Sequence, residues 1–160
     1  MRTKLLEAKY GSDKTPLKLG NLEIPCYVLE DGTRVFSGRG IQKILGSNSQ
    51  SGTWLQSFVR KPAISNRFAG EVSIIDKISN PIQFKRNNAS GSQSITNGFE
   101  VTLLIDICSA IIEANFAGEF DDLRIVRNAD IIIRSVAKVG IIALVDEVTG
   151  YQYKRERDEL

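Results

Sequence analysis

Apolar residues in the first half of the chain come in short runs separated by turn signals, which predicts short strands and helices. The runs Leu22–Leu29 and Arg34–Phe36 flank Asp31-Gly32, a dipeptide that readily adopts the backbone angles of a tight hairpin turn. We therefore predict a β-hairpin over residues 22–36. Pro25 has no N–H to donate and is expected at an edge or a bulge of this hairpin.

The same half of the chain carries signals for several further short elements. Ser37 predicts the start of a helix that ends near Leu45, with Gly46 as its stop signal. Beyond it, the spacing of apolar and polar residues predicts a helical turn or two at 54–59, a helix near 64–75, a brief strand at 82–84 and a polar, mobile loop at 87–94.

From Phe99 onward, apolar positions are dense enough for long helices. Residues 101–114 would be apolar on more than half of a helical circumference, and Gly118 predicts the turn that follows. Asp121-Asp122 favours the start of a second helix over residues 123–145, because carboxylates stabilise a helix amino terminus. We predict that these two helices are buried and pack as a hairpin.

Charged residues interrupt the second long helix, which makes a membrane span a poor interpretation despite its length. The interruptions are Arg124, Arg127, Asp130, Arg134 and Lys138. Gly150 predicts a turn before a charged helix over residues 151–160. That helix has no stop signal, and we therefore expect the chain to be truncated at its carboxy terminus.

These elements predict an α+β fold, in which a small antiparallel β-sheet with short helices precedes a helical part dominated by two long apolar helices. A chain of 160 residues fits one domain or two small ones. We predict two regions: a basic hairpin-and-helix region over residues 1–80, and a helical region over residues 81–160.

The two halves of the chain differ in charge, although the net charge is only +2. Residues 1–70 carry eleven basic and five acidic side chains, whereas residues 71–160 carry ten and fourteen. A nucleic acid would therefore meet the first half. The candidate contacts, with Trp54 offering an aromatic face, are Arg34, Arg39, Lys43, Trp54, Arg60, Lys61 and Arg67. The alternative is a solvated basic face with Trp54 in a local core.

The chain contains no histidine, which removes the commonest general base, the Ser/His and Cys/His arrangements and His-ligated zinc. Cys26 and Cys108 lack metal-binding spacing and are expected to be reduced thiols. Ion pairing or exposure explains the carboxylates near the apolar helices better than a magnesium nuclease site; they are Asp106, Glu113, Asp130, Asp146 and Glu147. We predict no enzyme activity, metal or cofactor.

The segment Ala137–Gln152, AKVGIIALVDEVTGYQ, resembles the P-sixty-three C domain family of phages and mobile elements, whose molecular activity is not established. Gly98-Phe99-Glu100 and the following LIDIC extend this resemblance over roughly residues 80–160. Val148 stands where family members usually have alanine. In the first half, DGTRVFSGRGIQKILG resembles the hairpin-helix opening of Bro-type phage antirepressors, which implies DNA binding and regulation.

The charge asymmetry and the resemblance predict a phage- or prophage-type regulator that binds DNA through its first half and self-associates through its helical half. The alternative is an interaction or oligomerisation module without nucleic-acid binding, which exposure of Ile131-Ile132-Ile133 or Ile141-Ile142 would favour. The expected partners are DNA and a second copy or another protein, with no membrane and no small-molecule substrate. The amino terminus lacks the apolar stretch of a signal peptide, and a cytoplasmic location is expected.

Overall fold

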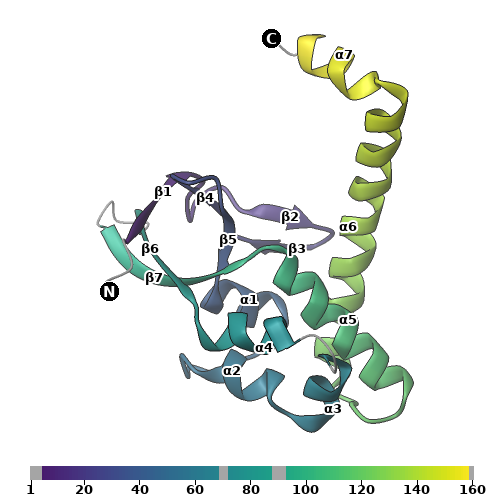
Figure 1. The fold of residues 1–160 in the computed structure, drawn as a ribbon. Coiled ribbons are helices and arrows are strands. Elements are labelled where there is room, and N and C mark those ends of the chain that lie inside the picture. The colour runs from purple at the N-terminus through teal and green to yellow at the C-terminus, as the bar shows by residue number, and fades with distance from the viewer. Residues whose placement is uncertain (1–4, 69–71, 88–92, 159–160) are drawn as a thin grey trace.

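The computed structural model describes residues 5–68, 72–87 and 93–158, and it confirms the predicted α+β class (Figure 1). The strands are β1 (Leu6–Tyr10), β2 (Leu17–Leu19), β3 (Leu22–Ile24), β4 (Tyr27–Leu29), β5 (Arg34–Ser37), β6 (Ile82–Asn87) and β7 (Gln93–Glu100). The helices are α1 (Gly38–Ile44), α2 (Trp54–Val59), α3 (Pro62–Ser65), the 3-10 helix η1 (Asn66–Phe68), α4 (Val72–Ser79), α5 (Thr102–Phe116), α6 (Leu123–Thr149) and α7 (Tyr151–Asp158).

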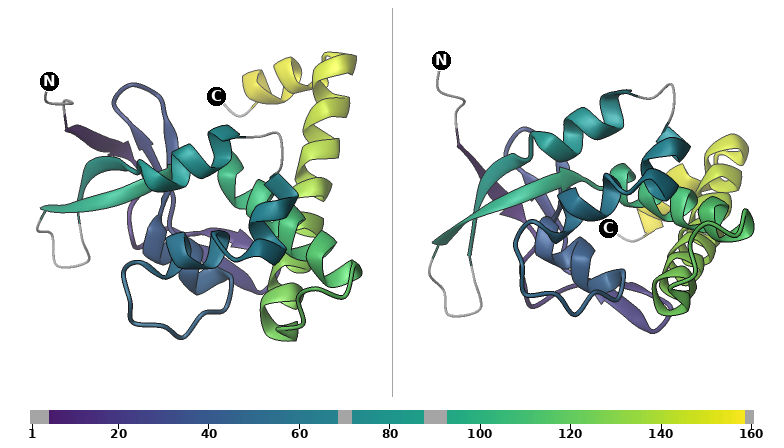
Figure 2. Two further views of the ribbon diagram at one scale, coloured as in Figure 1. Left: turned by 60° about the horizontal axis from the view of Figure 1, so that its bottom comes forward. Right: turned by 90° about the horizontal axis from the view of Figure 1, so that it is seen from below.

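Five strands form a small closed barrel in the order β1-β4-β5-β7-β6, and β2 and β3 form a separate two-stranded sheet. Strands β1 and β6 are parallel, while the other neighbouring pairs are antiparallel. The short helices lie at one end of the barrel, and α5 and α6 pack beside them (Figures 1 and 2). The boundary expected at residue 80 falls between strands of this barrel, so the two predicted regions share one sheet and one main core.

The predicted hairpin forms from β4 and β5, with Tyr27 opposite Val35 and a turn that places Gly32 at φ +90°. The Thr33 amide donates to the Asp31 carboxylate at 3.0 Å and lowers the pKa of Asp31. The first strand of this hairpin is shorter than predicted. The strand is interrupted at Pro25, and the residues before it form β3, which pairs with β2 instead. Proline supplies no N–H to a strand ladder and fixes φ, which explains the break.

The short helix after the hairpin is confirmed. The Ser37 hydroxyl accepts a hydrogen bond from the Gly40 amide at 2.9 Å, and Gly46 follows the helix with φ +95°. Helix α2 is confirmed as well. The helix predicted near 64–75 is wrong as a single element: α3 and η1 end by Phe68 and α4 begins at Val72, while residues 69–71 lie outside the described residues.

Strand β6 is longer than the strand predicted at 82–84, and β7 is a strand that the sequence pattern does not predict. They pair from Ile82 opposite Gly98 to Asn87 opposite Gln93, so a loop beginning at Asn87 and ending at Ser94 is wrong; residues 88–92 lie outside the described residues. Phe99 belongs to β7, and the following helix begins at Thr102, one residue later than expected. The polar composition of both strands conceals them, because only alternate residues such as Phe84 face the barrel interior.

Helices α5 and α6 form the predicted hairpin, but only the first half of α6 is covered. Helix α5 is buried along most of its length, and α6 buries Ile125, Ala129 and Ile132 against the core. Beyond Val136 the apolar residues of α6 are exposed, and that part extends past the rest of the fold before Gly150, at φ +79°, turns the chain into α7 (Figures 1 and 2). The prediction that both helices are buried is therefore wrong for half of α6.

Candidate functional site

The residues predicted to contact nucleic acid come together only in part, at a surface that we call the basic hollow. Arg39 and Lys43 lie four residues apart on α1, which places them on one helical face. Both are exposed, and within the described residues neither forms an ion pair. The hollow has a volume of about 470 Å³ and is lined by Arg39, Gln42, Lys43, Ser47, Asn48, Ser49 and Gln50.

Two contacts hold the basic hollow in shape. The buried Gln42 side chain donates to the Ser49 carbonyl at 2.6 Å, which fastens the polar loop after α1 to the helix. The Asn128 side chain of α6 donates to the Ile44 carbonyl at 3.1 Å, and Arg124 packs beside Gly46. Arg124 therefore brings a third cation close to the end of α1, which sequence reasoning did not include because it lies 81 residues beyond Lys43.

The other residues predicted to contact nucleic acid either form contacts within the fold or lie away from the basic hollow. Trp54 stacks on Phe58 with ring centroids 4.7 Å apart and packs against the main core, as the alternative interpretation of this residue expected. Arg67 donates to Glu119 at 2.8 Å. Lys61 lies 5.7 Å from the centroid of the Phe58 ring.

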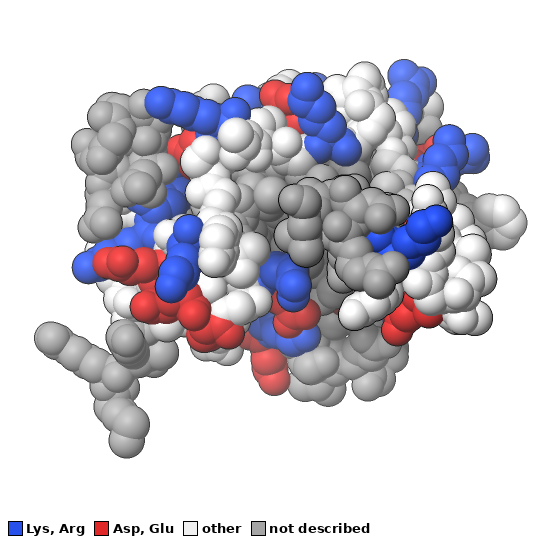
Figure 3. Space-filling model, turned by 90° about the horizontal axis from the view of Figure 1, so that it is seen from above, with Lys and Arg blue, Asp and Glu red and all other residues white. Residues whose placement is uncertain are grey.

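Arg60 and Arg34 are both exposed, but they occupy different surroundings. Arg60 directly follows α2, and Arg34 lines a separate, apolar hollow. Of the seven predicted residues, the structure thus places Arg39 and Lys43 together and Arg34 away from them. On the face seen from above, basic and acidic side chains lie close to one another (Figure 3).

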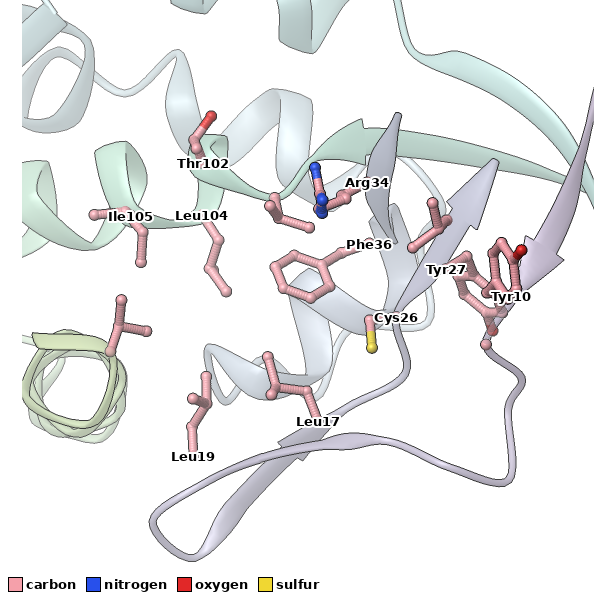
Figure 4. A pocket seen from close by; sticks show the side chains of 14 residues that line it. Tyr10, Leu17, Leu19, Cys26, Tyr27, Arg34, Phe36, Thr102, Leu104 and Ile105 are labelled. Atoms are coloured by element: carbon pink, nitrogen blue, oxygen red, sulfur yellow. The ribbon is translucent and has the colours of Figure 1, made fainter. Parts of the chain in front are cut away.

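A second hollow, which we call the apolar groove, lies between β5, the β2–β3 hairpin and α5. It has a volume of about 470 Å³. Leu104 and Ile105 of α5 lie across it from Phe36 of β5, with Leu17 and Leu19 on another side (Figure 4). These residues come from distant parts of the sequence, so no local pattern marks the groove.

One end of the apolar groove is fastened by a polar contact among three elements. The Tyr27 hydroxyl donates to the Asp13 carboxylate, and Arg86 forms an ion pair with the same carboxylate and donates to the Thr96 hydroxyl at 2.8 Å. Burial raises the pKa of Tyr27, and the bond to Asp13 raises it further. Asp13 therefore ties the loop after β1 to β4 and β6.

We expect Asp13→Ala to lower the free energy of unfolding by about 2 kcal/mol, because it leaves the Tyr27 hydroxyl and the Arg86 guanidinium without their partner. Chemical denaturation of the variant and the parent measures the loss. Glu113→Ala, which removes an exposed carboxylate that forms no hydrogen bond or ion pair among the described residues, is the control and should change stability by less than about 0.5 kcal/mol. Equal effects of the two variants would contradict the assigned role of Asp13.

Other chemistry-bearing groups are dispersed. Burial raises the pKa of the Cys108 thiol to about 12, which keeps it protonated at neutral pH. Asp130 forms an ion pair with Arg134 at 3.0 Å. In the described part of the chain, no three His, Cys, Asp or Glu side chains are grouped as metal ligands, and no helix is long and apolar enough to cross a membrane.

Comparisons of the chain with protein-family models, with curated protein sequences and with solved structures find no match. The surfaces of this chain that bear on its function are the basic hollow, the apolar groove and the exposed half of α6.

Proposed function

We propose that this chain is an assembly module that self-associates through the second half of α6. The observation that carries the proposal is a run of apolar side chains on that helix, each between 52 % and 86 % exposed: Val139, Ile141, Ile142, Leu144, Val145 and Val148. We call residues 139–148 the apolar segment. It includes the Ile141-Ile142 pair, whose exposure favours an interaction module.

The apolar segment is unusual for a surface helix because its six exposed apolar side chains spread over about 220° of the helix circumference, at 100° per residue. A surface helix normally has one apolar stripe and a polar opposite face, whereas a helix that is apolar all round is found buried. Large exposed apolar patches on soluble proteins mark interaction surfaces. Removing such side chains from water is favourable by ~25 cal/mol per Å² of apolar area.

Light scattering on the purified chain over a range of concentrations tests this proposal. We expect the average mass to rise with concentration toward that of a dimer or a larger assembly. A mass that stays at that of one chain up to high concentration would contradict self-association.

A second candidate function is nucleic-acid binding at the basic hollow. Arg39 and Lys43 favour it because, within the described residues, these two exposed cations form no ion pair and share one polar surface. Phosphate binding needs such groups and no covalent chemistry. The resemblance of residues 31–46 to the opening of phage antirepressors agrees with this role, and the regulatory, non-enzymatic function that it implies is part of this second candidate.

Charge reversal tests the second candidate. We expect Arg39→Glu with Lys43→Glu to weaken duplex-DNA binding at least about tenfold at low salt and to reduce the slope of log affinity against log salt by about 1.8, because two phosphate contacts are lost. A fluorescence titration at several salt concentrations measures both quantities. Lys14→Glu with Lys18→Glu is the control, since these exposed lysines lie outside the hollow and carry the same charge.

Unchanged affinity in the folded Arg39 and Lys43 double variant would contradict a nucleic-acid site at this hollow. Undetectable binding by the parent chain at low salt would leave the assembly module as the function.

A further inference from the structure

The apolar groove and the apolar segment are adjacent parts of one chain, yet neither covers the other. Val136 of α6 lines the groove, and the apolar segment begins three residues later. Because α6 is one uninterrupted helix, Leu144 lies about 12 Å further along its axis than Val136, at 1.5 Å per residue. The segment of a given chain therefore stands beyond that chain's own groove.

Resting on the proposed self-association, we infer that the apolar groove of one copy receives the apolar segment of a second copy, in a reciprocal two-fold exchange. A two-fold contact is made twice by the same pair of surfaces. One arrangement would then cover both the apolar segment and the apolar groove of each chain. A different partner protein would instead need one surface that fits the segment and another that fits the groove.

The apolar character of the two surfaces fits this exchange. Ile141, Leu144 and Val148 recur at spacings of three and four residues and therefore share one face of α6. The groove opposes this face with apolar walls from Phe36 and Leu104, and Leu17 at its edge is 40 % exposed.

Charge complementarity selects a second copy as the occupant. Arg34 lies at the groove, is exposed and forms no ion pair within the described residues. Glu147 is exposed, follows Leu144 by three residues and directly precedes Val148, so it borders the apolar face. A helix seated in the groove by this face carries a carboxylate beside its apolar contacts, and Arg34 supplies the opposite charge at the groove. The exchange forms this pair twice.

Charge-reversed variants, used singly and mixed, test the inference on the full chain. We expect Arg34→Glu and Glu147→Arg each to raise the dimer dissociation constant about tenfold, because each reversal places like charges together at both contacts. An equimolar mixture of the two variants should recover the parent affinity, since a heterodimer brings the two reversed charges together at one contact and keeps the native pair at the other. Analytical ultracentrifugation measures these constants.

A variant in the groove wall provides the second measurement. Leu17→Asp should weaken the dimer at least about tenfold, because a carboxylate would enter an apolar contact. Ile95→Asp is its matched control: Ile95 is 65 % exposed and lies on β7, away from the apolar groove and the apolar segment. Circular dichroism and thermal unfolding verify that each variant is folded.

The outcomes separate this inference from the proposed function. Weakening by Leu17→Asp together with recovery in the mixture supports the exchange. A parent dimer that Leu144→Asp disrupts, but that Leu17→Asp leaves as tight as Ile95→Asp does, overturns the groove as the docking site while self-association stands. Failure of the mixture to recover overturns the Arg34–Glu147 pairing. A strictly monomeric parent chain overturns both the inference and the proposed function.

Discussion

Replacing Gly11 with alanine is expected to lower the free energy of unfolding by about 3 kcal/mol or more. Gly11 has φ +90°, a conformation that costs an alanine about 1–2 kcal/mol. In addition, an added Cβ would overlap the Cys26 carbonyl oxygen and lie 3.1 Å from the carbonyl carbon. Those are backbone atoms next to β4, which pairs with β1, so relieving the overlap must displace strands of the barrel.

Gly32→Ala is the matched control for this prediction. Gly32 has the same φ of +90°, but no atom lies within 4 Å of the position that its Cβ would take. It should therefore lose only the conformational part, about 1–2 kcal/mol. Urea denaturation of both variants, followed by circular dichroism, isolates the steric part as their difference. Equal losses would contradict the steric explanation.

The elements that sequence reasoning predicts well are those with local signals. Ser37 and Gly46 bound α1 because a side-chain oxygen and a residue at positive φ satisfy the helix ends within a few residues. Asp122 does the same for α6 by accepting from the Ile125 amide at 3.4 Å. Such signals act over one turn, so they can be found without knowing the rest of the fold.

The elements that sequence reasoning misses depend on partners that are distant in the sequence. Strand β1 is short, and it becomes a strand by pairing with β4 and with β6, where Leu6 lies opposite Phe84. The closed barrel therefore has no signature in any short stretch of sequence. The exposed half of α6 is a related case, because its apolar composition predicts burial, whereas burial within one chain also requires a neighbouring surface along its whole length.

The candidate surfaces, like the helices and strands, can be predicted only where a local spacing fixes the relative positions of their residues. Arg39 and Lys43 are predicted together and found together, since a spacing of four on one helix fixes their relative position. Arg34 is close to them in sequence but lies on β5 and faces the apolar groove. Trp54 is drawn into the core by its stacking on Phe58. Proximity in sequence therefore defines a shared surface only within one regular element.

Introducing aspartate at Leu144 is expected to abolish the proposed self-association, raising the dissociation constant by about 100-fold or more. Leu144 is 58 % exposed, so the substitution should leave the fold of a single chain intact while placing a carboxylate in the apolar contact. Light scattering and analytical ultracentrifugation at matched concentrations measure the change. The variant should remain at the mass of one chain where the parent forms assemblies.

Ile95→Asp again provides the control, because it removes a similarly exposed apolar side chain and adds the same charge on β7. Its assembly should match that of the parent. If both variants dissociate, the added charge acts through general repulsion between copies and the apolar segment is not the contact. If neither dissociates while the parent assembles, self-association uses another surface. Loss of assembly in Leu144→Asp alone would assign the contact to the second half of α6, where an exposed apolar helix requires a partner.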